Sequence, residues 1–250
     1  MTPVPCAPLV LAADAAAAKP APDLGPMPEW DLTDLYRAPD APEVERDLAA
    51  AASEAVRIRD TFQGKLTEAA KDGARLAEAV TAYESLSDLM GKLGSYAGLL
   101  YAANQADPQR AKFYGDVSEK LTRIATDLIF FELELNTIDD ATLAAALKSP
   151  ALSRYAPWFA DLRKEKPYQL EEKIERLFTE KGQTGSSAFG RLFGETISGL
   201  RFAVDGEKEP LGIEQTLNLM SDPSGARRKA GAEALAKVFK DNIRLFTLIT

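Results

Sequence analysis

The chain has 250 residues, 46% of them hydrophobic, which is enough for one large domain or two modest ones with a buried core. Its net charge of −8 argues against a nucleic-acid surface, and no apolar run approaches the roughly 18 residues of a membrane span. We therefore expect neither nucleic acid nor a membrane among its partners. Histidine is absent and Cys6 is the only cysteine, which excludes a disulfide framework and the usual histidine- or cysteine-based zinc and catalytic centres.

The N-terminal segment is rich in proline and alanine, and we interpret residues 1–27 as a disordered leader. Part of it, "CAPLVLAADAAAA", has the composition of an export signal, but Asp14 interrupts it and no lysine or arginine precedes it. A damaged or mis-started export signal is the alternative interpretation. We expect a cytoplasmic protein by default, in agreement with the near absence of cysteine.

Helical patterns dominate from residue 40 onward. Asp40, Pro42 and Glu43 have the spacing of a capped helix start, and apolar residues then recur every three or four positions up to Phe62. Gly64 follows as a stop signal.

The clearest helix start lies further along, where Asp107 is a predicted N-cap and Pro108 suits the first turn. Apolar residues at alternating steps of three and four then run from Tyr114 to Leu135. At 1.5 Å per residue, this pattern predicts one continuous helical seam roughly 30 Å long.

The pattern changes once, near residues 200–213. Phe202 and Val204 alternate with polar or small neighbours, and Asp205-Gly206 is a typical hairpin turn. Pro210 restricts the second strand to a sheet edge. We expect one small β-hairpin here, at a domain boundary, with helices on either side.

Carboxylates are the most plausible catalytic groups in a chain without histidine, but their spacing favours structural roles. Glu132 and Glu134 are two positions apart, so on a helix they face different directions and cannot share a proton or a metal. Glu171, Glu172 and Glu175 lie in the first turns of a predicted helix, where the helix dipole favours negative charge. We therefore assign no catalytic, cofactor-binding or metal-binding residue to this chain.

Seven segments in order resemble the N-terminal half of oligoendopeptidase F, a zinc oligopeptidase family related to thimet oligopeptidase. The segments are "LGPMPEWDLTDLY", "LGSYAGLLYAANQADP", "DLIFFELELNTIDDATLAAAL", "SPALSRYAPWFADLRK", "QLEEKIERLFTEK", "RLFGETISGLRF" and "TLNLMSDPSGARRKAGAEAL". No single motif is decisive, but together they extend over nearly all of the chain, from about Leu24 to Thr250.

The resemblance implies an all-α chain. We expect residues 1–27 to be the leader and residues 28–199 a multi-helix, bundle-like N-terminal domain. Residues 200–250 would then form the hairpin and the first helices of a truncated, helical metallopeptidase domain.

The resemblance also implies a function. Family members carry an H-E-x-x-H helix and a further glutamate in their C-terminal half, where two histidines and a glutamate hold zinc and the motif's own glutamate acts as general base. The chain would thus be the N-terminal part of a zinc metalloendopeptidase that hydrolyses short oligopeptides, forming scaffold and channel wall. Its implied cofactor is zinc, and its implied partners are short peptides and its own missing C-terminal peptidase domain. No zinc ligand lies in this chain, so we expect it to be inactive alone.

The C-terminal sequence "KDNIRLFTLIT" places Asn242, Leu245, Phe246 and Ile249 at helical spacing, with no glycine, proline or polar tail after them. We interpret this as an interruption within a longer protein. The alternative is a stand-alone helical interaction module without catalytic activity.

Overall fold

The computed structural model describes residues 30–250, so the interpretation of residues 1–27 as a leader lies outside the described residues. The region Leu32–Thr250 forms one compact unit. It is mostly helical, and no sheet or barrel occurs among the residues described, which confirms the all-α class.

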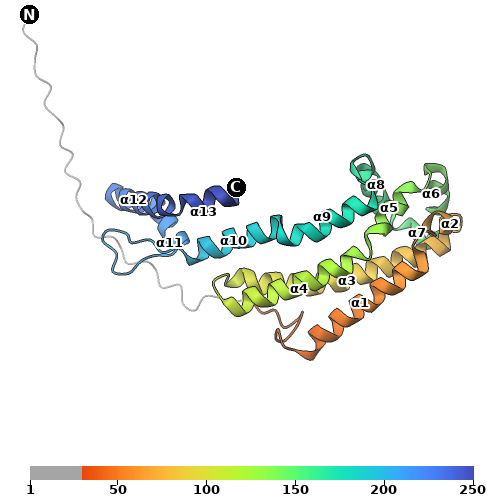
Figure 1. The fold of residues 1–250 in the computed structure, drawn as a ribbon, viewed down its shortest axis with the longest axis horizontal. Helices are drawn as coiled ribbons and strands as arrows, with labels where there is room; N and C mark the ends of the chain where they lie inside the picture. The colour runs from red at the N-terminus through yellow and green to blue at the C-terminus, as the bar shows by residue number, and fades with distance from the viewer. Residues whose placement is uncertain (1–29) are drawn as a thin grey trace, which may run out of the picture. The chain divides into compact units, whose positions relative to one another are not determined.

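Three long helices pack along one another (Figure 1). They are α1 (Pro42–Phe62), α3 (Gly73–Ala103) and α4 (Pro108–Thr126). Short helices gather around one end of this group. They are α2 (Leu66–Ala69), α5 (Ile129–Thr137), α6 (Asp140–Ala146), α7 (Pro150–Ser153) and α8 (Ala156–Glu165), followed by a 3-10 turn η1 (Lys166–Tyr168).

Two further helices, α9 (Glu172–Thr184) and α10 (Ser186–Gly199), follow in line (Figure 1). Helix α9 packs on α4 and α5. The remaining elements are α11 (Ile213–Asn218), a 3-10 turn η2 (Leu219–Ser221), α12 (Gly225–Asp241) and α13 (Ile243–Ile249). Helix α13 returns to contact α10.

The main hydrophobic core lies where α1 and α3 meet the short helices. Phe131 is fully buried there, and its ring stacks on that of Tyr83 at 4.4 Å between centroids, with the two planes nearly parallel. A second cluster joins the segment before α1, including Tyr36, to α1, α3 and α4. A third, around Phe202 and Leu235, lies between the 200–211 segment and α12.

The predicted helix starts are confirmed in one case and corrected in another. Asp107 caps α4, since its carboxylate accepts a hydrogen bond from the Gln109 amide at 2.8 Å. Asp40 does not cap α1. That helix begins at Pro42, because proline suits the first helical position, and the cap position therefore falls on Ala41, which has no side-chain oxygen.

The predicted seam from 114 to 135 lines the hydrophobic clusters, but it is not one continuous helix, because α4 ends at Thr126 and α5 begins at Ile129. Phe130 and Phe131 are consecutive in α5 and both buried. Neighbouring helical residues point about 100° apart, so α5 is covered over more than one narrow face. At the break, Arg59 of α1 contacts the Asp127 carboxylate at 2.7 Å.

The predicted β-hairpin is not seen. Phe202 and Leu211 form a single antiparallel bridge, with both N–O distances 2.9 Å. The pairing cannot extend inward because the Val204 carbonyl accepts a hydrogen bond from the Glu207 amide within the turn. It cannot extend outward because α10 ends at Gly199 and α11 begins just after Leu211.

The buried stacking of Phe131 predicts a large stability effect. We expect Phe131→Ala to lower the free energy of unfolding by about 3–5 kcal/mol, since it removes a fully buried ring and leaves a cavity. Phe178→Ala is the matched control, because that ring is 63% exposed, and its effect should stay within about 0.5 kcal/mol. Urea unfolding measures both. Equal losses would contradict this account of the core.

Asp47 of α1 accepts a hydrogen bond from Tyr36 in the segment before α1, and this contact should make the stability of the protein depend on pH. Burial acts to raise the pKa of Asp47, but hydrogen bonds from Arg46 and Tyr36 outweigh it and hold that pKa below its usual value. The resulting stabilisation is full above about pH 4, near the unfolded value, and is lost as the pH falls through the lower folded-state pKa.

We therefore expect the free energy of unfolding to fall more steeply below about pH 4 in the native protein than in Asp47→Asn. Tyr36→Phe removes only the hydroxyl donor at 2.9 Å and should give an intermediate slope. Denaturant titrations at pH 6, 4, 3 and 2 give these slopes. If the Asp47→Asn curve parallels the native one, the carboxylate has no such role.

Candidate functional site

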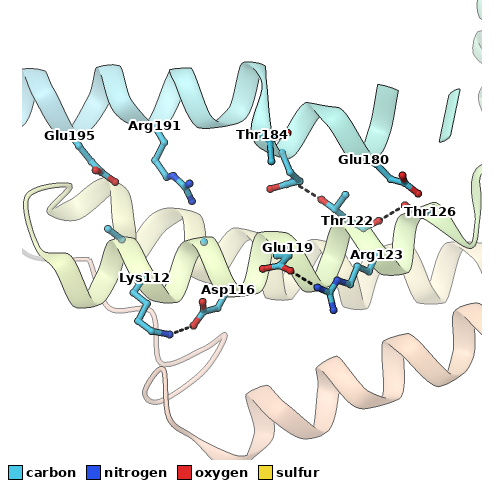
Figure 2. Close-up of a pocket in the computed structure, with 13 residues that line it drawn as sticks. Lys112, Asp116, Glu119, Thr122, Arg123, Thr126, Glu180, Thr184, Arg191 and Glu195 are labelled. Atoms are coloured by element: carbon cyan, nitrogen blue, oxygen red, sulfur yellow. Dashed lines mark hydrogen bonds and ion pairs between the residues drawn. The ribbon is translucent and has the colours of Figure 1, made fainter. Parts of the chain in front are cut away.

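A groove of about 980 Å³ lies between α4 on one side and α9 and α10 on the other (Figure 2). Its lining is strongly charged, with cations and anions interspersed. The charged residues are Lys112, Arg123, Arg191, Asp116, Glu119, Glu180 and Glu195.

The charges that α4 contributes form pairs within that helix. Lys112 pairs with Asp116 and Arg123 pairs with Glu119, both at i,i+4 spacing and both solvent-exposed (Figure 2). Such exposed pairs contribute a few tenths of a kcal/mol to a helix. They neutralise one another, so they leave the α4 side of the groove without net charge.

The charges of α10 differ, because they are not paired. Arg191 and Glu195 both extend from α10 toward α4, one turn apart (Figure 2). Among residues 30–250, neither side chain has a hydrogen bond or an ion pair. A Cβ atom at Gly115 would lie 2.9 Å from Nη1 of Arg191. The missing side chain of Gly115 thus lets the guanidinium lie directly against α4.

A smaller pocket of about 340 Å³ adjoins this groove and shares Gln183 and Arg191 with it. Tyr101 lines this pocket and is only 7% exposed, and its ring stacks on Tyr114 at 4.9 Å. The Tyr101 hydroxyl is buried and has no hydrogen-bond partner among the described residues. Burial raises the pKa of Tyr101, the charge of Glu195 raises it further, and Arg191 acts in the opposite direction.

The prediction that Glu132 and Glu134 face different directions is confirmed. The Tyr83 hydroxyl donates to Glu132 at 3.0 Å, whereas Glu134 accepts from the backbone amides of Gly64 at 2.5 Å and Leu66 at 3.4 Å. The two carboxylates therefore face different elements. Through these two hydrogen bonds, Glu134 of α5 holds the turn between α1 and α2 in place.

Residues 30–250 contain neither a metal-binding cluster nor a membrane-spanning helix. In this range no three cysteine, aspartate or glutamate side chains lie together in a way that could hold a metal ion. Within the same range, no helix has the length and apolar character needed to cross a bilayer. The assignment of no catalytic residue stays a prediction.

An apolar face on α9 and α10 is the other feature of this region. Neither helix has a buried residue. Large side chains on both are exposed, with Phe178 at 63%, Leu177 at 52% and Phe193 at 47%. Phe193 meets Phe246 of α13 edge-on, at 6.1 Å between centroids.

The groove is not apparent from the sequence. Arg191 and Glu195 have the i,i+4 spacing of an ordinary surface ion pair, and such spacing does not reveal that the two fail to pair. The buried hydroxyl of Tyr101 depends on packing between α3, α4 and α10, which a single sequence does not show.

Comparisons with known proteins show what the chain is similar to. A family model described as oligopeptidase F matches residues 134–202. The crystal structure of oligoendopeptidase-F from Enterococcus faecium matches with a TM-score of 0.74 and 17% identity, over 85% of this chain and 41% of that one. An inferred peptidase from Chlamydophila abortus matches with a TM-score of 0.45 and 18% identity, over 88% of this chain and 37% of that one. No curated protein sequence matches.

The fold is thus similar to that of part of oligoendopeptidase-F. The resemblance to the N-terminal portion of oligoendopeptidase F is confirmed, since the family model covers segments in which it was recognised. The chain spans less than half the length of the solved structures that it matches.

The hydrogen bonds of Glu134 predict that its loss lowers stability more than the loss of the exposed Glu180 does. Glu134→Ala removes the acceptor of two backbone amides and should lower the free energy of unfolding by about 1–2 kcal/mol. Glu180→Ala, in the exposed groove lining, is the control and should change it by less than about 0.5 kcal/mol. Thermal and urea unfolding provide the comparison. A neutral Glu134→Ala would remove the structural role assigned to Glu134.

Proposed function

We propose that this chain is the helical N-terminal portion of a zinc metalloendopeptidase of the oligoendopeptidase F type, an enzyme that hydrolyses short oligopeptides. The fold likeness over 85% of the chain carries this proposal, together with the family-model match at residues 134–202. The role of the chain is that of scaffold and channel wall.

The residue types present in the chain indicate which part of the enzyme would hold the zinc ligands. The chain has no histidine, and the described carboxylates form no cluster that fits a zinc ion. The zinc ligands and the general base therefore belong to a C-terminal peptidase domain, which is the principal partner of this chain. No catalytic step is assigned to any residue here.

The exposed apolar face of α9 and α10 supports such a partnership. Contiguous apolar side chains on a surface are typical of interaction sites. We place the boundary between the helical domain, residues 28–199, and the first elements of the peptidase domain, residues 200–250, at the end of α10. The separate hydrophobic cluster around Phe202 and Leu235 supports that division. A cytoplasmic location stays part of the proposal.

This function predicts an inert chain when it is isolated. We expect less than stoichiometric zinc by metal analysis after dialysis, and no cleavage of an internally quenched peptide. A commercial metallopeptidase serves as positive control, and chelator-treated samples reveal contaminating protease. Stoichiometric zinc, or turnover that persists through repeated purification, would contradict the assignment of the active site to another domain.

The decisive experiment is to sequence the gene beyond the codon for Thr250 and to assay the product. An open frame containing H-E-x-x-H and a downstream glutamate, with zinc-dependent cleavage of short peptides, supports the proposal. An immediate stop codon favours the alternative, a stand-alone helical interaction module without catalytic activity.

A further inference from the structure

The paired pockets between α4 and α10 contain two donors that lack acceptors. One is the guanidinium of Arg191, and the other is the buried hydroxyl of Tyr101. We propose that these two groups bind the carboxylate of a short peptide, with the rest of the peptide extending along the α4 groove. That the ligand is a peptide rests on the proposed function, whereas the carboxylate follows from the geometry.

The guanidinium fits a carboxylate well. Its planar fork of N–H donors binds both oxygens of such a group. Arg191 reaches the floor of the pocket because Gly115 has no side chain, and a Cβ there would lie 2.9 Å from Nη1. The pocket is also open at Gly190, where an added Cβ would meet no atom within 4 Å.

The Tyr101 hydroxyl supplies an independent observation. Buried polar groups in proteins are almost always hydrogen-bonded, because leaving one without a partner is unfavourable. The phenol is 7% exposed, lines the same pocket as Arg191 and has no acceptor among the described residues. An incoming carboxylate oxygen would accept its hydrogen bond.

Neighbouring charges limit the kind of anion that fits. Glu195 lies one turn from Arg191, and Glu180 lines the same groove, and neither has a cation partner within the described part of the chain. These acids disfavour a dianion such as phosphate more than a monoanionic carboxylate. They can also accept hydrogen bonds from peptide N–H groups. The groove volume of about 980 Å³ has room for several residues of extended peptide.

The test uses the 250-residue chain and two probes that differ only at one end, tetra-alanine with a free carboxylate and tetra-alanine amide. Binding is followed by NMR shifts of the amides of Gly115, Gly190 and Gly194, which line the pockets. We expect the free acid to bind about tenfold more tightly than the amide, as charge-assisted hydrogen bonds imply.

Two variants test whether Arg191 and Tyr101 bind the peptide carboxylate. Arg191→Gln and Tyr101→Phe should each reduce the preference for the acid severalfold. Arg57→Gln is the control, because that arginine lies on α1 outside both pockets and is paired with Glu54. It should leave the preference unchanged. Circular dichroism confirms that each variant is folded.

Gly115→Ala distinguishes a loss of binding from a loss of folding. Alanine is the better helix former by about 1 kcal/mol, so the variant should be at least as stable as the native chain. Its Cβ would nevertheless displace the guanidinium, and binding of the acid should weaken.

Three outcomes of the binding comparison overturn the proposal, and a fourth is the absence of binding. They are equal binding of acid and amide, an acid preference that survives Arg191→Gln, and inorganic phosphate binding more tightly than the free acid at these glycines. Absence of shifts at millimolar peptide overturns it equally. The peptidase proposal is tested separately, by the gene sequence and by peptide cleavage. The preference for the free acid is measured on this chain alone, so either proposal can fail without the other.

Discussion

Helix α4 carries two opposite faces, and the rest of the molecule depends on keeping them apart. Val117 and Ile124 are buried against α1 and α3. The residues at steps of four, three and four, namely Lys112, Asp116, Glu119 and Arg123, line the groove beneath α9 and α10. The helical period directs one set inward and the other outward. A rotation of α4 about its axis would therefore disturb the core and the groove together.

The break after α4 has a related consequence. Helix α5, in which Phe130 and Phe131 are both buried, contacts α2 and α8. Helix α9 then starts from that end and returns over α4. Helices α9 and α10 bury no residue of their own, and Gln183 of α9 donates a hydrogen bond to the Thr122 hydroxyl of α4. A groove can persist there, whereas two apolar faces would close on each other.

Sequence reasoning was reliable where the cause was local. The Asp107 cap depends on two neighbouring amides, and the different directions of Glu132 and Glu134 follow from helical geometry. It failed where tertiary contacts decided. The seam across residues 114–135 lies in the hydrophobic clusters as its period predicts, but the period does not show that the helix is interrupted after Thr126. Likewise, the hairpin was prevented by the flanking helices, a constraint that turn and strand propensities do not include. The overall class was predictable because the ordered set of segments, and not any one motif, carries the resemblance.

At Gly115, the residue that gives the most stable helix differs from the residue that leaves space in the groove. Glycine inside a helix is less stable than alanine by about 1 kcal/mol, and alanine at this position would also cover the exposed backbone. The native fold keeps a position where the helix is weaker, and the guanidinium of Arg191 fills the space that this leaves. That guanidinium is then held near Glu195 without pairing to it. The buried hydroxyl of Tyr101, which lines the same pocket and has no partner among the described residues, is the observation that an external acceptor explains and that packing of the helices does not.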